Sequence, residues 1–311
     1  MEKRKNILIW LGGASFALLC CLCVWLITQN ISRAKSENEQ PRTNYYVNVL
    51  ATPPLPETLT FCGEKVPLDD YTVREGLDRE LTAICYQHST TLLCLKRSAR
   101  YFPTIEKILK EEGVPEDIKY LCVTESSLSN AISSAKAVGF WQFIEATAKQ
   151  YGLTVTEEVD ERYHVEKATR AACKYLKNGK QQLGTWSLAA AGYNMGSGGV
   201  SKSMSNQSQS QYWDIYFNPE TARYVYRILA YKLIFENPTL YNVRLNECDK
   251  YKPIPCKDIE VTCSVSNWYT FCQENGMTYK ELKTFNPWIR SSKLTVPAGK
   301  TYIIKKPVKQ K

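Results

Sequence analysis

The sequence predicts a mainly α-helical protein in three parts: a hydrophobic N-terminal helix, a helical domain over residues 74–240 and a small α+β unit over residues 251–311. Three observations indicate this architecture. An uncharged run covers residues 7–28, helical periodicity continues from residue 74 to about residue 237, and short β-like runs flank two helices after residue 251.

The composition is that of a folded protein. Of its 311 residues, 44% are hydrophobic and 23% are charged, which excludes a disordered or collagen-like chain. No internal repeat points to a solenoid or a propeller. Forty Lys and Arg outnumber thirty-one Asp and Glu, and the net charge of +9 favours an anionic partner. Because the basic residues are scattered rather than gathered on one helix face, nucleic acid is not the expected partner.

Residues 1–28 are expected to form a cytoplasmic basic tip and a transmembrane anchor. A basic run at residues 3–5 precedes 22 uncharged residues, 7–28, which matches a membrane span of about 20 residues. A cleaved signal peptide and a lipoprotein signal are the alternatives, although a secretory apolar region is shorter, about 7–15 residues. Positive charge before the span orients the N-terminus inward, so the rest of the chain is expected outside the cytoplasm.

Residues 29–73 are polar and contain several prolines, so a stalk or linker is expected there. From residue 74 the apolar spacing predicts helices, and Gly113-Val114-Pro115 marks the end of one helix and the start of the next. The predicted helices cover Leu77–Cys94, Ser98–Glu112, Pro115–Leu128, Phe140–Tyr151, Val165–Leu176, Trp186–Met195 and Pro219–Glu236.

The C-terminal unit is predicted to have a βααβ order. Strands are expected over Ile259–Cys263 and Thr301–Ile304, with helices Trp268–Gly276 and Thr278–Thr284 between them. A unit of this size is near the lower limit of independent stability, so a disulfide would be useful in it.

Nine of the twelve cysteines follow the hydrophobic run, an odd number in a compartment that permits disulfides. Cys248 with Cys256, and Cys263 with Cys272, are the candidate bridges. Cys122 and Cys173 fall in helical patterns and are expected to be buried thiols. The chain has only two His residues, and neither a metal site nor a cofactor is expected.

Glu125 is the candidate catalytic group. It follows Ile118, Leu121 and Cys122 by seven, four and three residues, so it points to the apolar side of its helix. Burial raises the pKa of a carboxyl group and suits it to donate a proton near neutral pH. The alternatives are an ion pair with a buried cation such as Arg100, or a solvated position at the helix end.

The segments around Glu125 resemble the lytic transglycosylase (SLT) domain related to goose-type lysozyme, and most of all the membrane-bound lytic murein transglycosylase D group. The resemblance covers about residues 95–237 and implies a lysozyme-like helical fold. It rests on several motifs in the expected order: Glu125-Ser126-Ser127-Leu128, Ser133-Ser134-Ala135-Lys136-Ala137-Val138-Gly139-Phe140-Trp141-Gln142-Phe143, Asp160-Glu161-Arg162, Ala190-Ala191-Gly192-Tyr193-Asn194-Met195-Gly196 and Glu220-Thr221-Ala222-Arg223-Tyr224-Val225.

The resemblance implies a single-carboxylate mechanism on peptidoglycan. Ordinary glycosidases use two carboxylates. Here Glu125 would protonate the glycosidic oxygen between N-acetylmuramic acid and N-acetylglucosamine. It would then accept the proton of the muramyl 6-hydroxyl as that group attacks the anomeric carbon, giving a 1,6-anhydro sugar. The expected location is therefore the periplasmic face of a bacterial envelope, with peptidoglycan strands as the partner and protein partners unassigned.

The same resemblance implies that six further residues contact the glycan: Ser133, Ser134, Gln142, Tyr193, Asn194 and Tyr224. Each has a structural alternative. Ser133 can be a cap or turn residue, with Ser134 in its role. The two tyrosines can belong to the core, and the two amides can brace loops. For Trp141, Phe143 and Met195, core packing is favoured over a sugar-binding surface.

Two positions depart from the family pattern. Lys136 stands where relatives usually have glycine, and a backbone position that needs a positive φ resists lysine. Gly192 stands where relatives have a second alanine. The added cation of Lys136 is alternatively suited to an anionic muramyl or peptide carboxylate.

The C-terminal unit weakly resembles a LysM carbohydrate-binding module, through Trp268-Tyr269-Thr270-Phe271-Cys272, Tyr279-Lys280-Glu281-Leu282, Phe285-Asn286-Pro287-Trp288 and Val296-Pro297-Ala298-Gly299. Glycan binding and a purely structural role are both compatible with it. For the whole chain, a hydrolytic muramidase on the same fold and a non-catalytic wall-binding scaffold are the alternatives to a transglycosylase.

Overall fold

The computed structural model describes residue 22, residues 24–29 and residues 51–308, which belong to two units, 1–51 and 52–311. In the first unit residues 24–29 are helical. Within the described ranges, no helix combines the length and the apolar content that a membrane crossing requires. Most of the expected anchor, residues 7–28, lies outside those ranges.

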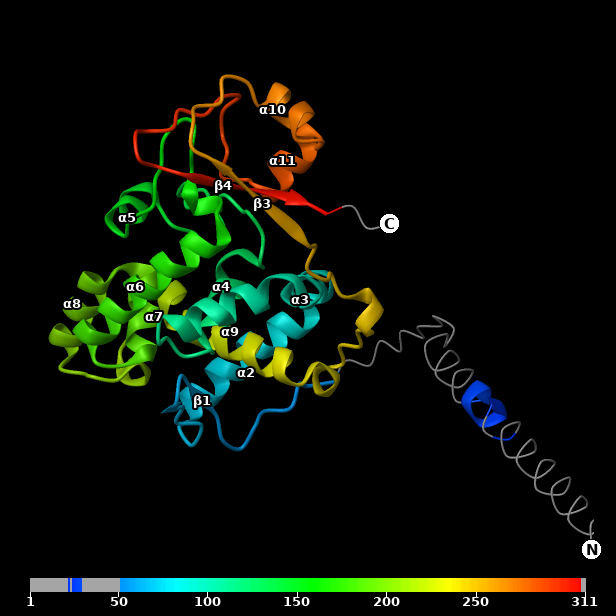
Figure 1. The fold of residues 1–311 in the computed structure, drawn as a ribbon. Coiled ribbons are helices and arrows are strands. Elements are labelled where there is room, and N and C mark those ends of the chain that lie inside the picture. Colours follow the sequence, from blue (N-terminus) through cyan, green and yellow to red (C-terminus); the bar gives the residue numbers. More distant parts are fainter. Residues whose placement is uncertain (1–21, 23, 30–50, 309–311) are drawn as a thin grey trace, which may run out of the picture. The chain divides into compact units, whose positions relative to one another are not determined.

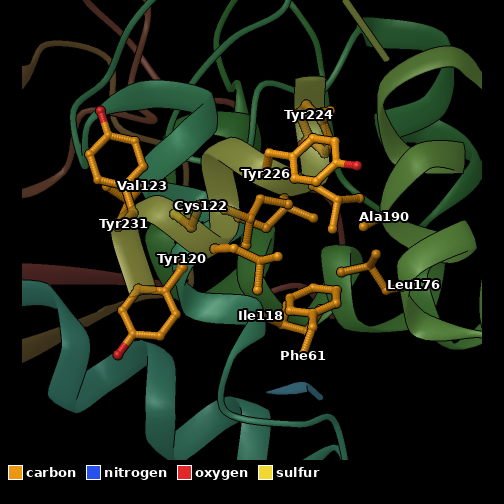
Figure 2. Packing of buried hydrophobic residues seen from close by; sticks show 14 of the residues in the cluster. Phe61, Ile118, Tyr120, Cys122, Val123, Leu176, Ala190, Tyr224, Tyr226 and Tyr231 are labelled. Atoms are coloured by element: carbon orange, nitrogen blue, oxygen red, sulfur yellow. The ribbon is translucent and has the colours of Figure 1, made fainter. Parts of the chain in front are cut away.

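The second unit begins with a segment that packs into the core, so the expected stalk does not continue to residue 73. Strands β1 (Thr60–Phe61) and β2 (Glu64–Lys65) pair antiparallel. The segment buries four apolar side chains in the main core: Leu59, Phe61, Val66 and Leu68. Figure 2 shows Phe61 in the same cluster as Ile118 and Leu176. Because prolines and polar residues separate these four apolar positions, the sequence contains no periodic pattern that predicts their burial.

Glu64 links this segment to a helix far along the chain. Its carboxylate accepts hydrogen bonds from the backbone N–H groups of Trp186 (2.6 Å) and Ser187 (3.1 Å). Both groups belong to the first turn of α7 (Trp186–Met195), where N–H groups lack helical acceptors and the helix dipole favours a negative charge. The carboxylate therefore caps α7 from outside.

Two long helices follow, α2 (Tyr71–Tyr86) and α3 (His88–Glu111), and both begin earlier than predicted. The Asp70 side chain accepts hydrogen bonds from the backbone N–H groups of Thr72 and Val73, which starts α2 there. The break lies at Gln87 rather than between residues 94 and 98, and Pro103 is accommodated inside α3.

The centre of the domain contains α4 (Ile118–Ser126) and α5 (Glu145–Gln150). α5 is shorter than the predicted helix over Phe140–Tyr151. Gly139 and Gln142 have φ values of 83° and 49°, so the chain there forms turns, and the helix begins only after them.

The remaining helices of the domain are α6 (Val165–Leu183), α7, α8 (Ser197–Gln207) and α9 (Pro219–Glu236), with 3-10 turns at Glu161–Tyr163, Tyr212–Asp214, Pro238–Tyr241 and Glu247–Asp249. α8 is not predicted from the sequence, because its Ser and Gly residues have low helix propensity. Val200 is its buried contact. α9 begins at Pro219, after an Asn218 side chain that caps its first N–H groups.

The helices pack around α9, which contacts α2, α4 and α7 (Figure 1). Glu80 of α2 is buried and accepts hydrogen bonds from Arg223 (2.6 Å) and Arg227 (3.2 Å) of α9, and from Arg79 (3.0 Å). Burial alone would raise the pKa of Glu80, but the hydrogen bonds and charges of these arginines outweigh it and lower the pKa. This cluster fastens α2 to α9.

The C-terminal unit has the predicted βααβ order. Strand β3 (Cys256–Val261) pairs antiparallel with β4 (Tyr302–Pro307), and α10 (Trp268–Glu274) and α11 (Tyr279–Phe285) lie between them in the chain. Thr278 and Glu281 form a reciprocal capping box at the start of α11. The unit is drawn in orange and red in Figure 1.

The predicted disulfides are wrong. All nine cysteines of the described residues are free thiols, including Cys248, Cys256, Cys263 and Cys272. Cys272 points into the core of the C-terminal unit, whereas Cys263 is exposed in the preceding loop, so their closeness in sequence does not bring the sulfurs together. Cys122 and Cys173 are buried thiols, as predicted.

Replacing Glu80 by Ala is expected to lower the free energy of unfolding by about 2–3 kcal/mol, because it leaves three arginines without their shared acceptor; the partial exposure of those arginines keeps the loss below that of a fully buried pair. Urea unfolding measures the change. Glu75→Ala, an exposed acid on the same helix, is the control. Equal changes in the two variants would contradict the stabilising role of the cluster.

Candidate active site

Glu125 lies in the last turn of α4, on the side of Ile118, Leu121 and Cys122, as predicted. Its side chain is half-buried. Burial of the carboxylate raises the pKa of Glu125 from 4.5 to about 7, and the negative charge of Glu220 acts in the same direction. A hydrogen bond from Tyr224 and the charge of Arg227 oppose this rise. Both protonation states of the group are therefore accessible near neutral pH.

The expected alternative partner of Glu125, Arg100, lies elsewhere. Its guanidinium donates to the carbonyl of Lys252 (3.1 Å) and covers the ring of Tyr251. Glu125 is therefore not held by an ion pair with Arg100, which leaves its proton free to respond to pH.

The turn after Glu125 has an unusual backbone. Ser127 and Leu128 have φ values of 53° and 55°, in the left-handed region that is uncommon for residues other than glycine. The Ser127 N–H bonds the carbonyl of Val123 (2.8 Å), and Arg97 donates to the carbonyl of Ser127 (3.0 Å). Leu128 is buried. These contacts hold a strained turn that ends α4 directly after the carboxylate.

Two predicted tyrosines lie around Glu125. Tyr224 of α9 is buried, and its hydroxyl donates a hydrogen bond to Glu125 Oε1. Tyr193 of α7 donates to the carbonyl of Trp141 (2.7 Å). Burial raises the pKa of the Tyr193 hydroxyl well above 10, and the charge of Glu125 contributes to that rise. The structure thus brings α4, α7 and α9 together at the carboxylate.

The loop over residues 131–143 holds the two predicted serines. The Ser133 hydroxyl accepts a hydrogen bond from the N–H of Ala137 (3.0 Å), so Ser133 closes the loop, whereas Ser134 is exposed. Lys136 has a φ of 60°, which agrees with the expectation that this position favours glycine. Its side chain is exposed.

The predicted amides both contact protein atoms. Gln142 Nε2 donates to the carbonyls of Ala131 (3.0 Å) and Gly139 (2.7 Å), and so braces the loop. Asn194 donates to Glu220 Oε1 (3.2 Å) and accepts from the Thr221 hydroxyl (2.7 Å). Asn194 therefore joins α7 to the start of α9.

Three further aromatic and apolar residues belong to the core rather than to an open surface. Trp141 is fully buried and its ring N–H donates to Thr169 (2.8 Å). Phe143 is buried, and Met195 packs against the same cluster. At the other departure from the family pattern, a Cβ on Gly192 would lie 3.1 Å from Leu183 and 3.2 Å from the Ser197 hydroxyl, which is tight for alanine.

Three charged residues near the site have no role that was predicted from the sequence: Asp160, Arg162 and Glu220. Asp160 and Arg162 form a buried two-point ion pair, with Nε–Oδ1 and Nη2–Oδ2 distances of 2.9 and 2.7 Å. Glu220 is exposed at the start of α9, and its charge reaches Glu125. All three belong to motifs that carry the family resemblance, and this was the signal available in the sequence. Within the described part of the chain, no cluster of His, Cys, Asp and Glu has the arrangement of a metal site.

Two segments of the chain match known protein families. Residues 102–216, which include Glu125, match the family "Transglycosylase SLT domain". The chain carries an SLT domain. Residues 257–310 match the "Soluble lytic transglycosylase C-terminal LysM-like domain", which identifies the βααβ unit. The SLT match ends before Tyr224, so this part of the site lies outside the matched range.

Individual relatives cover part of the chain. A curated relative is the "Membrane-bound lytic murein transglycosylase D" of Escherichia coli K12, 29% identical over 253 residues, which are 78% of this chain and 54% of that protein. The "Putative tributyltin chloride resistance protein" of Alteromonas sp. strain M-1 is 30% identical over 121 residues, 37% of this chain and 58% of that one. The chain thus spans about half the length of these relatives.

A solved structure also matches. It is an inactive mutant of the lytic transglycosylase Slt from Pseudomonas aeruginosa, with a TM-score of 0.37 and 22% identity. The match covers 49% of this chain and 26% of that one.

Replacing Tyr224 by Phe is expected to raise the pKa of Glu125 above about 7, because the lost hydrogen bond stabilises the ionised carboxylate. NMR titration of carboxyl-labelled glutamate in the two proteins measures this. Tyr193→Phe is the matched control, since its hydroxyl bonds Trp141 and not Glu125. An unchanged or lower pKa in Tyr224→Phe would show that the bond does not act on Glu125.

Proposed function

We propose that the chain is a peptidoglycan lytic transglycosylase in which Glu125 is the catalytic acid and base. The observation that carries the proposal is a half-buried carboxyl group with a pKa of about 7, at the end of a helix within an SLT domain. A group with that pKa is available as the acid and as the base within one turnover near neutral pH.

The chemistry needs no second carboxylate. Glu125 donates its proton to the glycosidic oxygen as the bond between N-acetylmuramic acid and N-acetylglucosamine breaks, and the N-acetylglucosamine hydroxyl leaves. The resulting carboxylate accepts the proton of the muramyl 6-hydroxyl, whose oxygen attacks the anomeric carbon. The products are an anhydromuramyl end and a regenerated acid, with no water consumed.

The residues around Glu125 have distinct proposed roles. Tyr224 holds one carboxylate oxygen and keeps the other directed at the substrate. Ser133 and Gln142 set the shape of the loop over residues 131–143. The hydroxyl group of the exposed Ser134 contacts the glycan. Tyr193 and Asn194 form the wall from α7, where Asn194 also orients Glu220.

The proposal places the enzyme in the bacterial envelope. The Escherichia coli relative is named a membrane-bound murein transglycosylase, and the uncharged run at residues 7–28 is the proposed anchor of this chain. The LysM-like unit and the net positive charge are both compatible with an anionic wall polymer as substrate.

Hydrolysis is a second candidate function, because a second carboxylate, Glu220, acts on Glu125. Its charge reaches Glu125, and a second carboxylate of this kind can activate a water molecule in an inverting glycosidase. A muramidase would release reducing ends that are one water heavier than anhydro ends.

Replacing Glu125 by Gln is expected to lower the turnover of purified sacculi by a factor of about 10² to 10⁴, the usual contribution of a general acid–base group. Wild-type turnover should also fall as the pH rises above about 7, because the acid then begins the reaction ionised. Mass spectrometry of the released muropeptides measures both effects and identifies the product ends.

The exposed Glu157→Gln is the matched control and should retain activity. Anhydromuramyl ends that survive in Glu220→Gln and vanish in Glu125→Gln support the transglycosylase. Reducing ends that need both residues indicate a muramidase. Sacculus binding without products in the wild type would support a wall-binding scaffold.

A further inference from the structure

The LysM-like unit shares a hydrophobic core with the SLT domain. Val138, Val159 and Tyr163 of the domain lie in one buried cluster with residues of the C-terminal unit. The members from that unit are Val261, Trp268, Cys272, Met277, Leu282, Trp288, Ile289, Leu294, Tyr302 and Ile304. A module carried on a free tether would not need residues of another domain to complete its core.

The backbones of the two parts are also joined. The Asp160 N–H donates to the carbonyl of Trp288 (2.9 Å), and the Arg290 N–H donates to the carbonyl of Glu158 (2.9 Å). Val159 and Ile289 form the β-bridge between them. The segment after α11 therefore pairs with residues 158–160 as a short strand would.

Polar and charged side chains add further contacts between the two parts. The Glu158 carboxylate accepts hydrogen bonds from the N–H and hydroxyl of Thr295 (2.6 and 3.2 Å). Lys305 of β4 pairs with Glu166 at the start of α6. The Arg290 guanidinium lies 4.3 Å from the centre of the Tyr163 ring.

The same segment also contacts the loop of the candidate site, whose Val138 is a member of the shared cluster. Arg162, already fixed by Asp160, donates to the carbonyls of Lys136 and Phe143, both at 3.3 Å. Gly139 has a φ of 83°, and a Cβ there would lie 2.1 Å from the Arg162 carbonyl oxygen. The loop over residues 131–143 therefore packs on residues 158–164, which pack on the LysM-like unit.

We propose that the LysM-like unit is a brace for the active site: by docking on residues 158–164, it holds the loop over residues 131–143 in its working conformation. The positioning residue on its side is Ile289. This role differs from glycan capture, because it acts on the rate of reaction rather than on recruitment to the wall. The effect on turnover rests on the proposed function, whereas the effect on loop order does not.

The test introduces Ile289→Asp in the full chain and follows amide hydrogen exchange. Ile289 is fully buried, so an aspartate there disfavours docking. We expect the amides of Val138 and Gly139, which are bonded within the loop, to exchange at least about tenfold faster, while those of α9 keep their wild-type rates. Wild-type protection in the loop would overturn the brace. If the substitution also opens the β3–β4 pair, the unit is undocked as well, so the brace still predicts faster exchange in the loop.

A charge exchange tests the same contact with less risk of unfolding. Glu166→Lys replaces the ion pair with Lys305 by a repulsion between two positive charges. We expect this repulsion to weaken docking and to speed amide exchange in the loop. Lys305→Glu in the same chain restores an ion pair of opposite direction and should return the loop to slow exchange. Glu274→Lys, on an exposed position of α10, is the matched control and should have no effect. A loop that responds equally to both lysine substitutions would contradict the proposal.

Kinetics separate a brace from a glycan-capture module. On short soluble glycan strands, undocking by Ile289→Asp should lower kcat, with a smaller change in KM. A higher KM with an unchanged kcat would assign the unit to substrate capture and overturn the brace. If the wild-type chain releases no products at all, the proposed function fails, while the exchange measurement still decides whether the unit holds the loop.

Discussion

The ion pair between Asp160 and Arg162 lies where three parts of the chain meet. Removing both charges from water is costly, and the cost is offset only if every polar group finds a partner. Here the guanidinium donates two hydrogen bonds to Asp160 through Nε and Nη2, and its Nη1 donates two more to carbonyls of the loop over residues 131–143. The backbone N–H of Asp160 faces the LysM-like unit. The same two residues therefore contact the loop through the Arg162 side chain and the C-terminal unit through the Asp160 backbone.

Glu125, in contrast, is half-buried without a compensating ion pair. Its carboxyl group is also removed from water, but the Tyr224 hydrogen bond and the charge of Arg227 do not compensate for the lost hydration and the charge of Glu220. The result is a group that exchanges its proton near neutral pH. The strained turn at Ser127 and Leu128 ends α4 at this point, so helix geometry and local electrostatics together place a reactive proton at the surface of the core.

Much of the fold and part of the site could be predicted from the sequence. The apolar stripe of α4 placed Glu125 inward, and the βααβ order followed from two β-like runs around two helices. Contacts between distant residues could not be predicted in this way. Neither the insertion of Phe61 into the core nor the cap that Glu64 provides leaves a periodic signal. The disulfide prediction failed for a related reason, since nearness in sequence does not fix which side chains face each other. The motif around Lys136 predicted its positive φ correctly, because glycine at such a position has a direct backbone cause.

The cap from Glu64 bears on how this protein can be dissected. The carboxylate reaches across 122 positions of the chain to α7, while the recognisable SLT match begins only at residue 102. Tyr224, Glu80 and Glu64 all lie outside that match, yet they hold the proposed catalytic carboxyl group, the α2–α9 contact and the start of α7. The matched segment is thus smaller than the unit that folds. A recombinant fragment cut at the limits of the match would lack the hairpin, α2 and α9, and with α9 the tyrosine that donates a hydrogen bond to Glu125.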